Sequence, residues 1–224
     1  MRPYFAKGGV TLYHADCRQV LPTLAEGSVD LVLTDPPYPK EYDHVWDVLA
    51  GEAPRTMRDG ASLITLCGHY QLPRVVTALS AGLRYHWLCI LPNAAGINPI
   101  MHGYGVKVNF KPAVWFVKGR FRPCRVMDDR LDRVGNWAKN LHEWGQPVCY
   151  APVVKLTGDG GMILDPFAGS GTTLLAAYQL GRRAIGVEIE EGHCETVARR
   201  LEQDYLPFAP EPAPSQAEFF VGAE

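Results

Sequence analysis

The sequence predicts an α/β fold with a mostly parallel sheet and helices on both faces. Short apolar runs alternate with helix-like segments, and Gly or Pro marks the boundaries between them. With 224 residues, 47% hydrophobic and 21% charged, the chain is long enough for one sizeable core. We therefore expect one domain over residues 1–206 and a tail over residues 207–224, where four prolines predict flexibility.

The elements follow in order from these runs. Apolar runs predict strands at residues 10–13, 29–33, 61–67, 85–91, 113–117 and 162–165, and a last strand that ends at Glu188. Helix-like segments occupy residues 17–24, 45–57, 71–81, 172–180 and 192–205. The span from residue 118 to about 145 is expected to be rich in loops, with helix-like residues from there up to Leu156.

The strand at residues 29–33 runs directly into Thr34-Asp35-Pro36-Pro37-Tyr38. One proline would be enough to end a strand, because it lacks the amide hydrogen that the next ladder bond requires. The second proline fixes the direction of the backbone carbonyls, while Asp35 offers an acceptor and Tyr38 a stacking face. Together these groups fit a planar ligand that bears an exocyclic amine.

A glycine-rich turn follows the strand at residues 162–165 and reads Pro166-Phe167-Ala168-Gly169-Ser170-Gly171-Thr172-Thr173. Glycines let the backbone approach a ligand closely, and the helix start aims amide hydrogens at a negative group. No Lys follows Gly171, so the turn is not a phosphate-binding P-loop, and Leu174 leaves the dinucleotide fingerprint incomplete. We predict a cofactor loop; the alternative is a tight connection from strand to helix.

Glu188 ends the next apolar run. In open α/β sheets an acid at this place commonly holds the ribose hydroxyls of a cofactor that lies over the preceding loop, which favours a nucleoside cofactor. The alternative is a helix cap, and we assign that role to Glu190 and Glu191 instead.

The two blocks, in the order Asp-Pro-Pro-Tyr first and glycine loop last, resemble the amino-methylating DNA methyltransferases that use S-adenosylmethionine. The resemblance is to the adenine-N6 type of the beta group, and it implies a Rossmann-like methyltransferase fold with a circularly permuted motif order. Residues 14–17, His-Ala-Asp-Cys, look like the family's adenine-contacting turn. Residues 142–147 look like its histidine-to-proline cofactor motif, although Gln146 stands where the family usually has Lys.

The resemblance implies a catalytic set. Asp35 and the carbonyl of Pro36 would each accept one amine hydrogen, Pro37 would help to fix that carbonyl, and Tyr38 would stack on the base. The base must first leave the duplex, at a cost of roughly a few kcal/mol. No metal and no covalent intermediate are required.

The resemblance also implies a cofactor set. Asp16 would accept from the adenine amine of the cofactor, although it also fits the N-cap of the helix that starts near Cys17. Glu188 would hold the ribose, and the glycine loop the methionine part. The expected set is Asp16, Cys17, His142, Asp165, Phe167, Ala168, Gly169, Ser170, Gly171, Thr172, Thr173 and Glu188.

Charge is uneven along the chain. The formal net charge is -2 and the pI about 6.4, which is not typical of a polyanion binder. Residues 101–134, however, hold eight basic and three acidic side chains, whereas residues 188–224 hold two basic and nine acidic ones. The basic segment could follow DNA phosphates, although a solvated face has the same composition. The candidates for DNA contacts are Lys107, Lys111, Arg120, Arg122 and Arg125.

The expected partner is double-stranded DNA, read by an insertion within residues 93–140. Its two candidate segments, residues 93–110 and 120–140, are short. We therefore expect either a small recognition site or help from a second copy in a homodimer, and a restriction endonuclease of the same system is a further candidate partner. The six cysteines form no Cys-x-x-Cys pair, so we expect reduced, buried thiols. No apolar run approaches a membrane span, and the cytoplasm is the expected location.

Several rival functions remain open. Cytosine-N4 methylation uses the same chemistry, but that subgroup typically has Ser in place of Asp35. Methylation of RNA or of a protein glutamine usually goes with Asn there and with the cofactor block first. A nucleic-acid-binding module without activity gives no reason for intact Asp35 and Tyr38, and a nicotinamide oxidoreductase gives none for two prolines. A zinc deaminase is excluded because Cys124 lacks a second cysteine three residues later.

Overall fold

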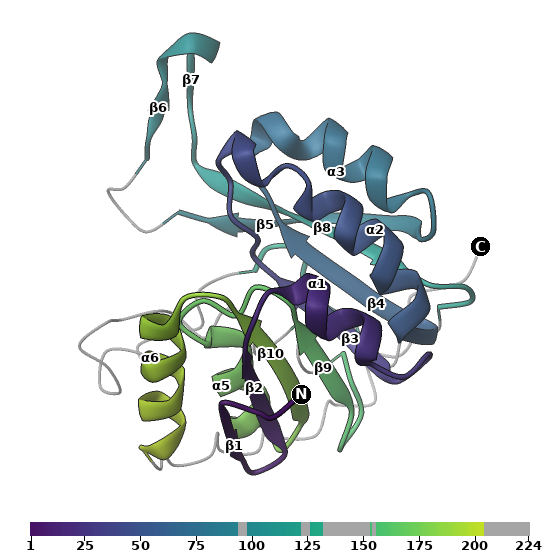
Figure 1. Cartoon of the computed structure of the whole chain (residues 1–224). Helices are drawn as coiled ribbons and strands as arrows, with labels where there is room; N and C mark the ends of the chain where they lie inside the picture. Colours follow the sequence, from purple (N-terminus) through teal and green to yellow (C-terminus); the bar gives the residue numbers. More distant parts are fainter. Residues whose placement is uncertain (94–97, 122–125, 132–152, 154–155, 204–224) are drawn as a thin grey trace.

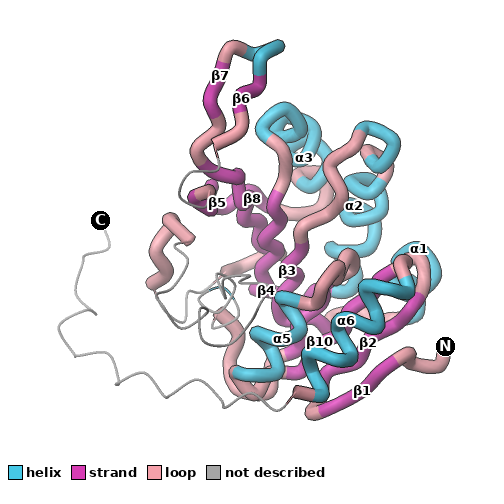
Figure 2. The backbone as a smooth tube through the Cα atoms, turned by 90° about the vertical axis from the view of Figure 1, so that its left-hand side faces the viewer, coloured by secondary structure: helices cyan, strands magenta, loops and turns pink. Residues whose placement is uncertain are grey.

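A computed structural model describes residues 1–93, 98–121, 126–131, 153 and 156–203. An eight-stranded sheet runs through the described part, with helices on both faces (Figures 1 and 2). This confirms the predicted fold class. None of the described helices is both long and apolar enough to cross a membrane.

The strands lie side by side in the order β1-β2-β10-β9-β3-β4-β8-β5. The five from β2 to β4 are parallel to one another, whereas β1 and β8 are antiparallel to their neighbours. Their bounds are β1 Phe5–Lys7, β2 Val10–His14, β10 Arg183–Glu188, β9 Met162–Asp165, β3 Val29–Thr34, β4 Met57–Leu66, β8 Phe110–Val117 and β5 Arg84–Pro92. The carboxyl ends of β3, β9 and β10 therefore meet at one edge of the sheet.

The helices form two layers (Figure 1). Helices α1 (Cys17–Val20), α2 (Val45–Thr56) and α3 (Leu72–Leu79) bury their apolar residues on one face, and α5 (Thr172–Gln179) and α6 (Glu191–Glu202) on the other. Strand β3 lies between the layers, so its residues alternate between the two cores. Val29 and Val32 belong to one core, and Leu31 and Leu33 to the other. Burial on both faces explains why residues 31–33 of this strand are all apolar.

Each strand predicted from an apolar run is present, with ends that differ by a few residues. The helix expected at residues 17–24 is instead a short α1 followed by a 3-10 turn, Leu21–Thr23, because Pro22 cannot donate the next helical hydrogen bond. Strand β1 was not predicted. The helix expected up to Leu156 and the tail at residues 207–224 lie largely or wholly outside the described residues.

A hairpin of β6 (Ile100–Met101) and β7 (Val106–Lys107) lies within the first candidate recognition segment. It stands clear of the sheet and the helices in both views (Figures 1 and 2). Four of the six cysteines, Cys17, Cys67, Cys89 and Cys194, are described; all four are free and buried, as expected.

Candidate active site

The two sequence blocks meet at the carboxyl edge of the sheet. Strands β3 and β9 are parallel neighbours. Past the residues that pair in the sheet, the hydroxyl Oγ1 of Thr34 donates to Oδ1 of Asp165 at 2.7 Å. The residues that follow both strands line one cavity of about 440 Å³. Asp35 and Gly169 therefore share a cavity although 134 positions separate them in the sequence.

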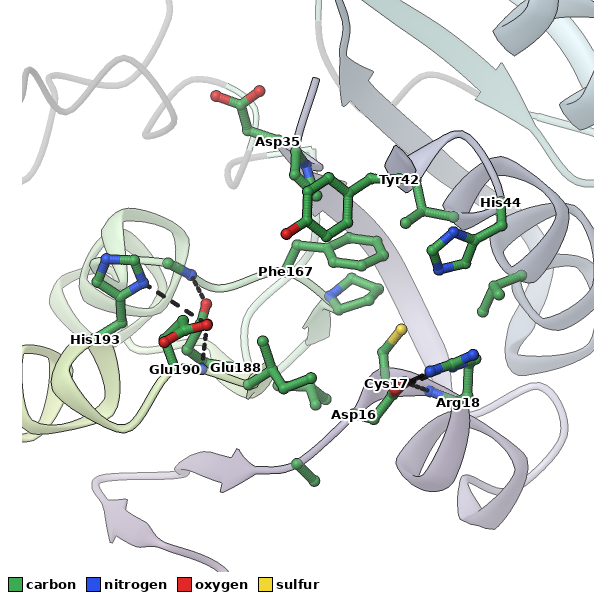
Figure 3. A pocket seen from close by; sticks show the side chains of 18 residues that line it. Asp16, Cys17, Arg18, Asp35, Tyr42, His44, Phe167, Glu188, Glu190 and His193 are labelled. Atoms are coloured by element: carbon green, nitrogen blue, oxygen red, sulfur yellow. Dashed lines mark hydrogen bonds and ion pairs between the residues drawn. The ribbon is translucent and has the colours of Figure 1, made fainter. Parts of the chain in front are cut away.

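The cavity contains part of the predicted site and several residues that were not predicted. Predicted residues on its wall are Asp16, Cys17, Asp35, Pro37, Phe167, Gly169 and Glu188. Tyr42, His44 and His193 line it as well. Nothing in the sequence predicted their presence there, apart from their position after a strand or at the start of a helix. Figure 3 shows the rings of Tyr42 and Phe167 between Asp35 on one side and Asp16 and Glu188 on the other.

Asp35 is already engaged by two neighbours. The hydroxyl of Tyr38 donates to Oδ1 of Asp35, and Nζ of Lys111 lies 3.5 Å from Oδ2. The same ammonium group lies 5.0 Å from the centre of the Tyr38 ring, within the range of a cation–π contact. A carboxylate, an aromatic ring and a cation thus form one cluster at the end of β3.

The backbone of the Asp-Pro-Pro-Tyr turn is held by the segment before α3. The carbonyl of Tyr38 accepts from the hydroxyl of Tyr70 at 2.6 Å and from Nε2 of Gln71 at 3.1 Å. Gln71 is buried, and its contact with Tyr38 is partly buried. Two prolines and two hydrogen bonds therefore fix the direction in which this turn presents its carbonyls.

The glycine loop is tied to the strand beside it. The amide of Gly169 donates to Oε2 of Glu188 at 2.7 Å, and the amide of Ala168 donates to the carbonyl of Val187 at 2.9 Å. From α6, Nη1 of Arg200 reaches the carbonyl of Ser170 at 2.5 Å. The loop is therefore fixed from both sides before any ligand binds.

Glu188 lies at the end of β10 with only 8% of its surface exposed. Its two carboxylate oxygens accept the amides of Gly169 and Glu190, and Nδ1 of His193 lies 3.7 Å from Oε1. A carboxylate oxygen can accept more than one hydrogen bond, so acceptor capacity remains toward the cavity. Glu190 occupies the N-cap position of α6 without a side-chain capping hydrogen bond, and Glu191 lies in the first turn of this helix.

Asp16 performs the capping role that the sequence left open. Its side chain accepts from the amide of Arg18 at 2.8 Å and from Nε of Arg18 at 3.0 Å. The side-chain hydrogen bond from Arg18 lowers the pKa of Asp16 below its ordinary value. Asp16 also lines the cavity, so a charged acceptor is available there.

Asp165 lies behind the loop and is not part of the cavity wall. It is 3% exposed and accepts from Thr34 and, at 3.2 Å, from the amide of Phe167. Burial raises its pKa from 3.8 to about 6, against the effect of these hydrogen bonds. The residue thus joins the two strand ends and does not face a ligand.

Replacing Asp165 with Asn is expected to change how stability depends on pH. The folded protein holds this proton more tightly than the unfolded chain does, so wild-type stability falls as the pH rises from 3.8 through about 6. Asp165→Asn removes that loss. The variant should be about as stable as wild type at low pH, and its free energy of unfolding should be higher by about 2 to 3 kcal/mol above pH ~7. Urea titrations across this range measure it. Asp47→Asn, at a side chain that is 66% exposed, is the control, and a pH-independent difference would contradict the prediction.

The other predicted residues are placed less directly. The cavity wall does not include Pro36, Tyr38 or the loop and helix residues Ala168, Ser170, Gly171, Thr172 and Thr173. Lys107 lies on the β6–β7 hairpin and Lys111 beside Asp35. Arg120 follows the far end of β8, beside the start of β4, so the structure does not group it with them. His142, Arg122 and Arg125 lie outside the described residues.

Known proteins resemble this chain in sequence and in fold. A family model described as DNA methylase matches residues 150–199. The type II methyltransferase M.BamHI of Bacillus amyloliquefaciens is 27% identical over 256 residues, covering 90% of this chain and 59% of that protein.

Several solved structures share the fold. The M1.HpyAVI–SAM complex has a TM-score of 0.67 at 22% identity, covering 86% of this chain and 98% of that one. The cytosine-N4-specific PvuII DNA methyltransferase has a TM-score of 0.70 at 18% identity, covering 92% and 97%. The chain therefore has the fold of class I methyltransferases, and its sequence similarities support an amino-DNA methyltransferase.

Proposed function

We propose that this protein transfers a methyl group from S-adenosylmethionine to the exocyclic N6 of adenine in duplex DNA, after the base has left the helix. The observation that carries the proposal is the shared cavity, in which Asp35 faces the same space as Phe167, Gly169 and Glu188. A turn that binds an amine and a loop that binds a nucleoside have no evident reason to lie side by side unless the bound cofactor reacts with the bound amine.

The amine of adenine is a poor nucleophile because its lone pair is delocalised into the ring. In the proposed reaction Asp35 and the carbonyl of Pro36 each accept one amine hydrogen, which favours tetrahedral geometry and directs the lone pair out of the ring plane. The fixed turn needs little reorganisation as charge develops, and this is where preorganised hydrogen bonds contribute most. Tyr38 supplies a stacking face whose contact would offset roughly 1 to 3 kcal/mol of the cost of base extrusion.

The described residues fit the cofactor. Asp16 and Glu188 provide carboxylate acceptors in different parts of one cavity, suited to an amine and to ribose hydroxyls. Nothing lies within 4 Å of the place where a Cβ on Gly169 would stand, so a ligand can approach this backbone closely. Bound there, S-adenosylmethionine would supply a methyl group on a positively charged sulfur. Phe167 and Tyr42 would then provide apolar contacts.

Asp35 favours adenine over cytosine as the target, because the cytosine-N4 subgroup that this chain resembles in fold typically has Ser at this place. Cytosine-N4 methylation remains the second candidate, since the structurally similar PvuII enzyme is cytosine-N4-specific. The beta-group assignment rests on the order of the two blocks along the chain. The homodimer, the endonuclease partner and the cytoplasmic location remain predictions.

Incubation with tritiated S-adenosylmethionine and unmethylated bacterial DNA, followed by nucleoside analysis, tests the proposal. We expect label in N6-methyladenine, because Asp35 stands where the cytosine-N4 subgroup typically has Ser. Label in N4-methylcytosine would replace the first candidate with the second. Sequencing of the methylated DNA then gives the recognition site.

A further inference from the structure

We propose that Lys111 is a positioning residue of the methyl transfer: its ammonium group fixes the carboxylate of Asp35 for the incoming base and does not bind a DNA phosphate. The inference rests on the proposed function and names the group that prepares its acceptor. The basic segment of the sequence makes Lys111 a candidate for a DNA contact. The structure instead places its ammonium group 3.5 Å from Oδ2 of Asp35.

Lys111 reaches Asp35 because of the direction of its strand. Strand β8 is antiparallel to β4, so its amino end lies at the edge where the parallel strands β3 and β4 have their carboxyl ends. The backbone at this point is fixed on both sides. Lys111 pairs with Leu91 on β5. On the other side, the amide of Cys67 donates to the carbonyl of Pro112 at 3.2 Å. The lysine side chain therefore starts from a fixed position beside the turn that carries Asp35.

Lys111, Asp35 and Tyr38 each contact the other two. The hydroxyl of Tyr38 donates to Oδ1 of Asp35, whereas Nζ of Lys111 lies near Oδ2 and 5.0 Å from the centre of the Tyr38 ring. The terminal torsion of an aspartate has a broad range, so a carboxylate without partners presents its oxygens over many angles. Two partners on different oxygens remove this freedom before the base arrives. Lys111 supplies one of these two restraints and also holds the ring that would stack on the base.

The ion pair between Lys111 and Asp35 becomes stronger when a base enters. With 33% of its side chain exposed, Asp35 is partly hydrated in the free protein. A base that covers Asp35 removes this water, which is unfavourable for a carboxylate without a counter-charge. The attraction to Lys111 grows at the same time, because it increases as the effective dielectric constant falls. The ion pair therefore contributes little to the stability of the free protein and more to the complex in which the reaction takes place.

The position of Lys111 opposes a role in phosphate binding, because an acid at 3.5 Å competes with a phosphate for the same ammonium group. The acid is also not a neighbour in the sequence, which contains no Asp or Glu between Asp59 and Asp128. The fold alone brings Asp35 to this lysine.

The two roles predict different measurements. Loss of a phosphate contact weakens duplex binding and lowers the slope of log affinity against log salt by about 1. Loss of a positioning contact leaves duplex binding unchanged and lowers the rate of transfer at saturating substrate.

The test combines single-turnover methyl transfer at saturating duplex and S-adenosylmethionine with anisotropy of a fluorescent duplex across a salt series. The duplex contains the methylated site that sequencing identifies. Lys111→Ala should lower the saturated rate about tenfold, because misplacing a group near the reacting atoms can cost up to about 100-fold. Its duplex affinity and salt slope should match those of wild type. Lys111→Arg keeps a cation at this place and should recover most of the rate.

A double variant shows whether Lys111 acts through Asp35. In the Asp35→Asn background the negative charge beside Lys111 is absent, so adding Lys111→Ala should cause little further loss. Arg84→Ala is the matched control, because this exposed cation pairs with Val117 at the other end of β8. It should transfer and bind as wild type does. Both alanine variants should keep the wild-type midpoint of urea unfolding.

Each outcome decides the inference. If Lys111→Ala transfers as fast as wild type, or loses the same factor with and without Asp35→Asn, Lys111 does not act through Asp35 and the inference is wrong. If Lys111→Ala binds duplex more weakly with a lower salt slope while the saturated rate is unchanged, Lys111 is a phosphate contact and the inference is equally wrong. If wild type itself transfers no methyl group to DNA, the proposed function fails and the inference falls with it.

Discussion

Asp35→Ala should reduce methyl transfer to DNA by about 100-fold or more, because removing a preorganised hydrogen-bond partner of a transition state commonly costs this much. The variant loses the acceptor for one amine hydrogen and the partner of both Tyr38 and Lys111. Binding of S-adenosylmethionine should persist, since Glu188, Gly169 and Asp16 are unchanged. Single-turnover transfer and calorimetric titration of the cofactor measure the two effects separately.

Asp35→Asn is the informative companion to this variant. It keeps a side-chain oxygen as an acceptor but removes the negative charge that faces Lys111, so intermediate activity is expected. Asp47→Ala serves as the control, because this carboxylate belongs to a surface ion pair with Arg74 away from the cavity. A substantial loss of cofactor affinity in Asp35→Ala would show that the residue acts on the cofactor and not on the base.

The central part of the fold could be predicted because residues 31–33 of β3 are buried on both faces and are therefore all apolar. The meeting of Asp35 and Gly169 also followed, since parallel strands bring their carboxyl ends to one edge of a sheet. The sequence did not show that β3 and β9 are neighbours, because this depends on the order of the strands in the sheet. The pairing of the two strands and the hydrogen bond between Thr34 and Asp165 show that they are neighbours.

Other features had no sequence signal. Tyr42, His44 and His193 enter the cavity only because a 3-10 turn and two helix starts point toward the same edge. The β6–β7 hairpin has strands of two residues, too short for any period-2 pattern to emerge. Lys111 and Arg120 belong to one basic stretch of the sequence, but Lys111 lies at the start of β8 and Arg120 beyond its end, so the length of the strand separates them.

The two glycines of the cofactor loop should respond differently to alanine, because their surroundings differ. Gly171 has a φ of 81°, and a Cβ there would lie 2.7 Å from Cγ2 of Val197 on α6. Gly169 has a φ of 50°, and a Cβ there would meet nothing within 4 Å. Both replacements carry the cost of a left-handed backbone, about 1 to 2 kcal/mol, but only Gly171→Ala adds a collision with a packed helix.

Gly171→Ala should therefore lower the free energy of unfolding by about 2 to 5 kcal/mol, the sum of the backbone cost and overpacking. Gly169→Ala should lose about 1 to 2 kcal/mol of stability. Its methyl group would stand where the cofactor approaches the loop, so affinity for S-adenosylmethionine should fall about tenfold, which corresponds to about 1.4 kcal/mol. Gly51→Ala, inside α2 with open space around it, is the control and should be neutral or slightly stabilising. Chemical denaturation and cofactor titration separate the two effects. Unchanged cofactor affinity in Gly169→Ala would mean that the loop serves only to connect strand and helix, the alternative that its glycine content left open.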